Sequence, residues 1–381
     1  MAQHALLSAS SASRWLNCPR SVRLTENIPD SGSSVYAAEG TLAHAVAESM
    51  LNHYKAHGNL KGWKPDKFRD MELWYDGMAG DVMPYVEYVI QAFETKGVAA
   101  SLDLESRLDF SEYVPSGFGT GDAVIIDDGV IEIVDLKFGK GVPVDADHNP
   151  QIMLYGLGAL LAYDYIYSID LVKMTIIQPR LDHITTYEMA ASALIDWAEK
   201  TVKPIAMMAY NGDGAIKAGE WCRWCKLKAR CKTRAESLKA IIDKREQEEL
   251  SDADLSEILA ARDSIKRWLT DIEDEVLDRL NAGGKLKGWK LVEGRSNRKI
   301  SKPDKLALCL MDYFPEDEIY KPKELKTLTE LEKLVGKKRF ADEFGDFVYK
   351  PEGKPTLVPE SDNRPALHSP ESEFEFEEEP K

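Results

Sequence analysis

Three short apolar segments with the residue types of β-strands constrain the fold of this chain most. Residues 104–110, 119–126 and 130–138 are mostly rich in valine, isoleucine and leucine, and turn-forming residues separate them. Asp128 and Gly129 stand between the second and the third segment, where this dipeptide favours a tight hairpin. The pattern therefore predicts an antiparallel meander of three strands.

Segments with helical periodicity surround these strands. Apolar residues recur at spacings of three and four both before and after the meander, and one further apolar run has the length of a strand. This alternation predicts a mixed α/β fold in which helices flank a central sheet. The expected helices are residues 13–24, 35–54, 81–95, 151–163 and 190–210, and the expected fourth strand is residues 171–178.

The chain has 381 residues, of which 44% are hydrophobic, and this length suggests more than one domain. We expect a core at residues 1–234, a helical region at 235–284, a small, mainly helical appendage at 285–355 and an acidic disordered tail at 356–381. The tail is expected to be disordered because its glutamates outnumber its few apolar residues. Within the helical region, Ser251 or Asp252 could cap the second of two helices.

Composition excludes several classes of protein. No stretch approaches the roughly 20 apolar residues that span a bilayer, and the first residues lack the features of an export signal. We therefore expect a soluble cytoplasmic protein without a membrane partner. The net charge of −16 argues at first sight against a polyanionic partner, but residues 220–245 hold nine lysines or arginines against three acids.

Three charged residues carry the strongest chemical signal. Asp135 and Lys137 alternate with Leu136 at the end of an apolar strand, so both project from the same side. The hairpin brings Asp122 onto the neighbouring strand. Two carboxylates suit Mg²⁺ or Mn²⁺, and a lysine can orient a water or stabilise charge developing on a phosphate. A surface ion pair is the plain alternative, but charges at the end of a buried strand are costly unless they serve a site.

These residues resemble the motifs of the PD-(D/E)XK nuclease superfamily, specifically its RecB-like branch. Besides Asp122 and Asp135-x-Lys137, the chain has a downstream Gln151-x-x-x-Tyr155. It also has Gly40-Thr41-Leu42-Ala43-His44, similar to the context in which this branch places a histidine on a helix before the sheet.

The resemblance implies a restriction-endonuclease-like core and assigns a role to each matching residue. The metal ligands would be His44, Asp122 and Asp135, with the backbone carbonyl of Leu136 as a further one. Lys137 would be catalytic beside Asp122 and Asp135, and Gln151 and Tyr155 would contact DNA.

Two features near the predicted site leave alternatives open. Asp135 stands where many relatives have glutamate, which leaves metal binding possible but could change the preferred metal. Glu105, on the first predicted strand, could join the site, or it could pair with Arg107 or another neighbour.

A cysteine cluster forms a second constellation. Cys222-x-x-Cys225-x5-Cys231 supplies three soft ligands, and Cys18 is the candidate for a fourth. One cysteine upstream and three downstream of the core is similar to the layout of iron-sulfur RecB-like nucleases. The resemblance implies a [4Fe-4S] cluster that holds the chain ends together, with a structural zinc ion as the alternative, and it leaves Cys309 as an ordinary buried thiol.

Together these features predict a metal-dependent DNA nuclease. We expect an exonuclease that acts on single strands or duplex ends, most similar to proteins of phage or prophage recombination and replication. The alternative is a non-catalytic DNA-binding or scaffold protein that keeps the fold and docks replication or recombination partners through its C-terminal helices.

Overall fold

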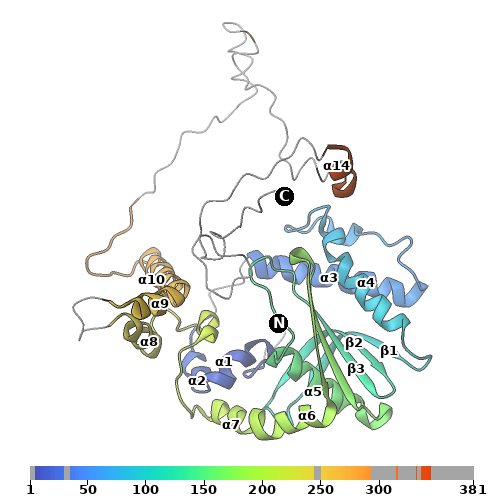
Figure 1. Ribbon diagram of the computed structural model, residues 1–381, viewed down its shortest axis with the longest axis horizontal. Helices are drawn as coiled ribbons and strands as arrows, with labels where there is room; N and C mark the ends of the chain where they lie inside the picture. Colours follow the sequence, from blue (N-terminus) through green and yellow to red (C-terminus); the bar gives the residue numbers. More distant parts are fainter. Residues whose placement is uncertain are drawn as a thin grey trace, which may run out of the picture. The chain divides into compact units, whose positions relative to one another are not determined.

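The computed structural model of the protein describes residues 5–29, 35–243, 250–292, 315, 332 and 336–344 (Figure 1). The chain divides into two compact units, Met1–Gly283 and Gly284–Lys381. The second unit contains helix α14 (Lys337–Phe344), while most of the predicted appendage and all of the predicted acidic tail lie outside the described residues. The first unit contains the sheet and every residue of the predicted sites. Cys309, which was predicted to be an ordinary buried thiol, lies outside the described residues.

A five-stranded mixed sheet forms the centre of the first unit, with the strands in sequence order across it. The third and fourth strands are parallel, and the other neighbours are antiparallel. The predicted hairpin is confirmed, because Asp127 pairs with Val130 and the intervening Gly129 has a φ of 78°. The strands are β1 (Ser101–Asp109), β2 (Phe118–Asp127), β3 (Val130–Leu136), β4 (Leu171–Gln178) and β5 (His183–Ala190).

Helices cover both faces of the sheet (Figure 1). Helices α3 (Val35–His57) and α4 (Met78–Glu94) pack on one face, where they share a buried apolar cluster with the strands. Helices α5 (Pro150–Tyr167) and α6 (Ala191–Trp197) pack on the other face in a second cluster. Because β3 and β4 are parallel, the chain between them has to cross the sheet, and α5 makes that crossover. The expected α/β fold with a helix-flanked sheet is confirmed.

The fifth strand is not predicted from the sequence. Residues 183–190 contain histidine, threonines and glutamate, and their side chains alternate between half-buried and exposed along the strand. This alternation is the signature of a sheet edge rather than of a buried strand, so the segment lacks the apolar run on which the other strands were recognised.

The single helix expected over residues 13–24 is wrong. The structure has two short helices, α1 (Ala12–Asn17) and α2 (Ser21–Thr25), separated at Cys18 and Pro19. Proline disfavours helical backbone at the residue before it, and Cys18 accordingly leaves the helix with φ −134° and ψ 71°. The break places Cys18 at the C-terminal end of α1.

The helical region after the sheet contains one helix more than expected. Helices α8 (Lys232–Ile242), α9 (Asp252–Ala260) and α10 (Arg262–Asn281) replace the two predicted ones. Ser251 caps α9 as expected, since its hydroxyl accepts a hydrogen bond from the backbone N–H of Asp254. Among the described residues, no helix combines the length and the apolar character needed to cross a membrane.

Candidate metal centre and cysteine cluster

Asp122 and Asp135 lie on adjacent strands at facing positions. The last paired residues of β2 and β3 at this end are Ala123 and Val134. The strands are antiparallel, so Asp122, which precedes Ala123, stands opposite Asp135, which follows Val134. On β1, Leu104 and Ser106 pair with the two neighbours of Asp122, and this places Glu105 opposite Asp122. Three acidic residues therefore form a row across three strands.

The side chains of β1 change from one face of the sheet to the other at this row. Leu102 of β1 belongs to the cluster under α3 and α4, whereas Leu108 belongs to the cluster under α5. A regular strand would keep both leucines on one face, because they are an even number of residues apart. Glu105, between them, has a φ of 46°, in the left-handed region that non-glycine residues rarely adopt. This conformation accounts for the change of face along β1, and such strain is often found at functional sites.

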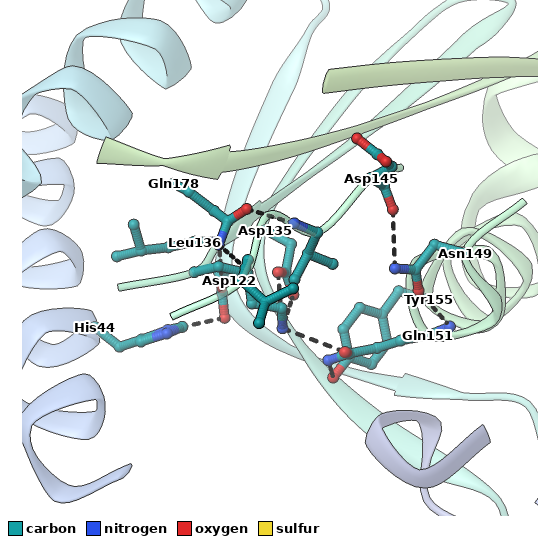
Figure 2. A network of polar contacts seen from close by, with 12 residues as sticks. His44, Asp122, Asp135, Leu136, Asp145, Asn149, Gln151, Tyr155 and Gln178 are labelled. Atoms are coloured by element: carbon teal, nitrogen blue, oxygen red, sulfur yellow. Dashed lines mark hydrogen bonds and ion pairs between the residues drawn. The ribbon is translucent and has the colours of Figure 1, made fainter. Parts of the chain in front are cut away.

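An imidazole from α3 completes the row. His44 Nδ1 lies 3.2 Å from Asp122 Oδ1, and Asp122 Oδ2 accepts a hydrogen bond of 2.7 Å from the backbone N–H of Leu136 (Figure 2). His44, Glu105 and Asp122 each offer one ligand atom, and these three atoms lie within 4.8 Å of one another. Asp135, which was predicted to ligate the same ion, is ion-paired with Lys137 in this structure.

Lys137 connects the acidic row to α5. Its Nζ lies 2.9 Å from Asp135 Oδ2 and donates a hydrogen bond of 3.2 Å to Gln151 Oε1 (Figure 2). The Gln151 side chain in turn donates to the Tyr155 hydroxyl at 3.1 Å. Asn149 caps α5 by accepting from the Gln151 backbone N–H, which fixes the first turn of the helix. The two residues predicted to contact DNA therefore lie beside the predicted catalytic lysine.

Sheet and helix approach closely at Tyr155. A Cβ atom added to Gly119 would lie 2.4 Å from Tyr155 Cε1, so only glycine fits at this position of β2. The absence of a side chain on Gly119 allows the tyrosine ring to pack directly on the strand.

Gln178 also belongs to this network, although no pattern in the sequence identifies it. Gln178 is almost fully buried at the end of β4 (Figure 2). Its side-chain oxygen accepts a hydrogen bond of 2.6 Å from the backbone N–H of Val144, and its side-chain nitrogen donates one of 3.1 Å to the backbone carbonyl of Val142. Gln178 thereby anchors the segment that joins Lys137 to α5. A single buried glutamine has no local pattern by which sequence could identify it.

The closeness of the acidic side chains changes the pKa values of Glu105 and His44. Burial and the charge of Asp122 raise the pKa of Glu105 to about 7, although the charge of His44 lowers it. Burial lowers the pKa of His44, but its hydrogen bond to Asp122 and the charge of that carboxylate outweigh burial and raise it above its usual value. Without a cation, Glu105 therefore keeps its proton up to a higher pH than an ordinary glutamate does.

Lys137 and Asp135 form an ion pair in which the aspartate is buried and the lysine is half-buried. Burial lowers the pKa of Lys137, but the charges of Asp135 and Asp122 raise it by more, so the side chain stays an ammonium. Burial raises the pKa of Asp135, whose side chain is 4% exposed, and the charge of Lys137 opposes this effect. With its pKa raised, Lys137 is a hydrogen-bond donor and a positive charge at neutral pH.

The structure brings Cys18 to the downstream cysteines. The backbone N–H of Lys217 donates to Cys18 Sγ at 3.4 Å, and that of Gly219 donates to Cys222 Sγ at 3.4 Å. Burial raises the pKa of Cys225, and the neighbouring thiols of Cys231 and Cys18 raise it further. All four thiols are free, and two of them, Cys18 and Cys222, are buried. Two segments roughly 200 residues apart in sequence thus meet at one sulfur-rich site.

The basic residues around this site mostly have carboxylate partners. Lys228 and Arg234 both contact Asp271 of α10, at 2.8 Å and 2.6 Å. Arg230 pairs with Glu275 of the same helix. These ion pairs connect the cysteine segment to α10 and neutralise part of the positive charge of residues 220–245.

Comparisons with known proteins include a match to one family model over most of the chain. The family model described as "Protein of unknown function (DUF2800)" matches residues 4–365. Glutamyl-tRNA reductase of Haloarcula marismortui is 30% identical over 89 residues, which are 22% of this chain and 20% of that enzyme. This chain therefore spans about a fifth of the length of that relative.

A solved structure described as "Crystal structure of SSO0001" is 15% identical and covers 59% of this chain and 84% of its own, with a TM-score of 0.27. At these values neither weak likeness carries an argument about the fold or the chemistry. The family match extends over the sheet, the acidic row and the cysteine cluster alike, and the chain therefore belongs to the family described as DUF2800.

Proposed function

We propose that this protein is a divalent-metal-dependent nuclease that hydrolyses phosphodiesters of DNA, at single strands or duplex ends. The observation that carries the proposal is the convergence of His44, Glu105 and Asp122, from three separate elements, within 4.8 Å beside the Asp135–Lys137 ion pair. Acidic side chains repel one another, so a fold that gathers them around a strained residue is best explained by a cation that they bind.

The donor set fits Mg²⁺ or Mn²⁺. Two carboxylates supply the hard oxygen ligands that these ions prefer, and an imidazole is compatible with Mn²⁺. Asp135 and the Leu136 carbonyl, at the end of the adjacent strand, are the further ligands that the sequence resemblance implies. A bound ion would polarise the scissile phosphate and lower the pKa of a bound water.

Lys137 has a distinct part in this proposal. Its ammonium is held by Asp135 and Gln151 at 2.9 Å and 3.2 Å, with Tyr155 fixing the glutamine. A charge held in advance, in a partly buried site, stabilises negative charge that develops on a phosphate without reorganising during the reaction. We assign Lys137 the roles of orienting the attacking water and of stabilising this charge.

The cysteine cluster is proposed to hold a [4Fe-4S] cluster that links the beginning of the core to its end. Four free thiols with no harder ligand among them fit either iron-sulfur or zinc, since both bind thiolates. The layout of the cysteines in the chain favours iron-sulfur. The cluster is assigned a structural role, because it would close a loop of roughly 200 residues.

The function is tested by incubating purified protein with end-labelled DNA. We expect degradation with Mn²⁺ or Mg²⁺, none after chelation, and at least about a 10²-fold loss in Asp122→Asn, since the substitution removes a charged ligand. The position of the label reveals the direction of digestion. An RNA strand of the same sequence tests whether the protein prefers DNA to RNA. A folded wild-type protein that binds DNA and leaves it intact under all these conditions would support the scaffold alternative instead.

Metal binding is expected to depend on pH through Glu105. Its pKa of about 7 means that it is largely protonated at pH 6, whereas a ligand must be ionised. The affinity for the metal should therefore increase as the pH rises through about 7. Below that pH, metal binding should release protons from Glu105 and also from His44. Calorimetric Mn²⁺ titrations in two buffers of different ionisation enthalpy measure this release.

Variants separate the contribution of Glu105 from the rest. Glu105→Gln should release fewer protons than wild type at pH 6, while Glu112→Gln, a matched change of an exposed glutamate, should release the same number. Equal proton release by Glu105→Gln and wild type would show that Glu105 is not a ligand.

A further inference from the structure

Arg107 occupies an exposed position next to the acidic row. It follows Glu105 by two residues on β1, and the register pairs it with Thr120 of β2, which is also exposed. Two residues along a strand correspond to about 6.7 Å. An extended nucleic-acid strand places successive phosphates at about that separation.

The guanidinium of Arg107 is held by an aromatic ring. Its Cζ lies 3.8 Å from the ring centroid of Phe118, the residue diagonally across the β1–β2 ladder. A cation stacked on a ring in this way keeps its position while its N–H edge stays available. This arrangement resolves the alternative left open for Glu105: among the described residues no ion pair joins it to Arg107.

Arg107 also differs from the cations near the cysteine cluster. Those of Lys228, Arg230 and Arg234 are bound to carboxylates of α10. Among the described residues, Arg107 makes no ion pair or hydrogen bond, although its charge helps to lower the pKa of Asp109, two residues further along β1. An arginine that is fixed on a ring, has no ion-pair partner among the described residues and lies two residues from Glu105 is arranged to bind an anion.

We infer that Arg107, stacked on Phe118 and facing Thr120, binds the phosphate adjacent to the one that is cleaved. The inference deepens the proposed function, on which it rests, by requiring a substrate with at least two consecutive phosphates. Arginine suits this contact because its fork can donate two parallel hydrogen bonds to one phosphate. The Thr120 hydroxyl offers another donor on the facing strand. The contact gives a protein with net charge −16 a local attraction for a polyanion beside its acidic site.

The test compares wild type, Arg107→Ala and Arg107→Gln on a labelled single-stranded oligothymidylate with Mn²⁺. Loss of a hydrogen-bonded charge should raise KM about 10- to 100-fold and leave kcat within about twofold. The slope of log KM against log salt should fall by about 0.7, the change expected for one lost phosphate contact on a single strand. Lys200→Ala, which removes one exposed charge from a helix, should match wild type in both respects.

A second measurement excludes indirect damage to the metal centre. The affinity of Arg107→Ala for Mn²⁺ alone, measured by calorimetry, should equal that of wild type. An unchanged KM, a loss confined to kcat or a weakened Mn²⁺ affinity would each overturn the inference while leaving the nuclease assignment intact. A wild-type protein that hydrolyses no DNA would instead reject the proposed function, and this inference with it.

Discussion

Replacing Lys137 with alanine is expected to lower kcat for DNA hydrolysis by about 10²- to 10³-fold, the usual effect of losing one donor that stabilises charge in a transition state. The expectation follows from the position of its ammonium, held between Asp135 and Gln151, and from the raised pKa that keeps it charged. KM should change little, because substrate phosphates away from the cleaved bond do not depend on Lys137. Single-turnover cleavage of end-labelled DNA measures the effect.

Two controls distinguish chemistry from folding in this experiment. Lys137→Ala leaves Asp135 buried without its counter-ion, which can cost several kcal/mol of stability, so circular dichroism must show a folded protein. Lys137→Gln keeps a donor toward both partners but removes the charge, and it should lose nearly as much activity. Lys140→Ala, an exposed lysine three residues further on, should be fully active. Retention of activity by both Lys137 variants would remove this residue from the mechanism.

Replacing Cys18 with serine is expected to lower the melting temperature by about 10 to 20 °C. A link between Cys18 and Cys222 closes a loop of roughly 200 residues, which in the chain-entropy picture stabilises the fold by about 5 kcal/mol. For a core of this size each kcal/mol corresponds to about 2 to 4 °C. Differential scanning calorimetry of both proteins, each before and after treatment with a chelator, measures the difference.

The chelator provides the thermodynamic control. Removing the metal should lower the melting temperature of wild type toward that of Cys18→Ser and should change the variant little. Equal melting temperatures for untreated wild type and variant would show that Cys18 is not a ligand. The same samples identify the metal: a brown protein with broad visible absorbance indicates iron-sulfur, whereas a colourless protein with stoichiometric zinc would reject the iron-sulfur assignment.

Local sequence was a good guide wherever a residue's environment depends on its neighbours in the chain. The meander, the tight hairpin at Gly129 and the cap at Ser251 were all predicted, because turn geometry and capping act over a few residues. The break at Cys18 was missed although Pro19 signals it, because helical periodicity on both sides masked the local effect of the proline.

The edge strand β5 and Gln178 were beyond such reasoning for a different reason. The edge strand is defined by its pairing with β4, and its own composition is that of an exposed segment. Gln178 acquires its role by binding a loop that lies more than 30 residues away in sequence. Both depend on contacts that exist only after the sheet has formed.

The sequence by itself determined the α/β class, the helix-flanked sheet and the residues able to carry metal chemistry, because hydrophobic period and residue type are local properties. Only the tertiary structure decided that Glu105 joins His44 and Asp122, that Asp135 pairs with Lys137, and that Arg107 has no ion-pair partner among the residues the structure describes. The physical reason is that distances between side chains on different elements, and the protonation that follows from them, exist only once β1, β2 and α3 have packed together.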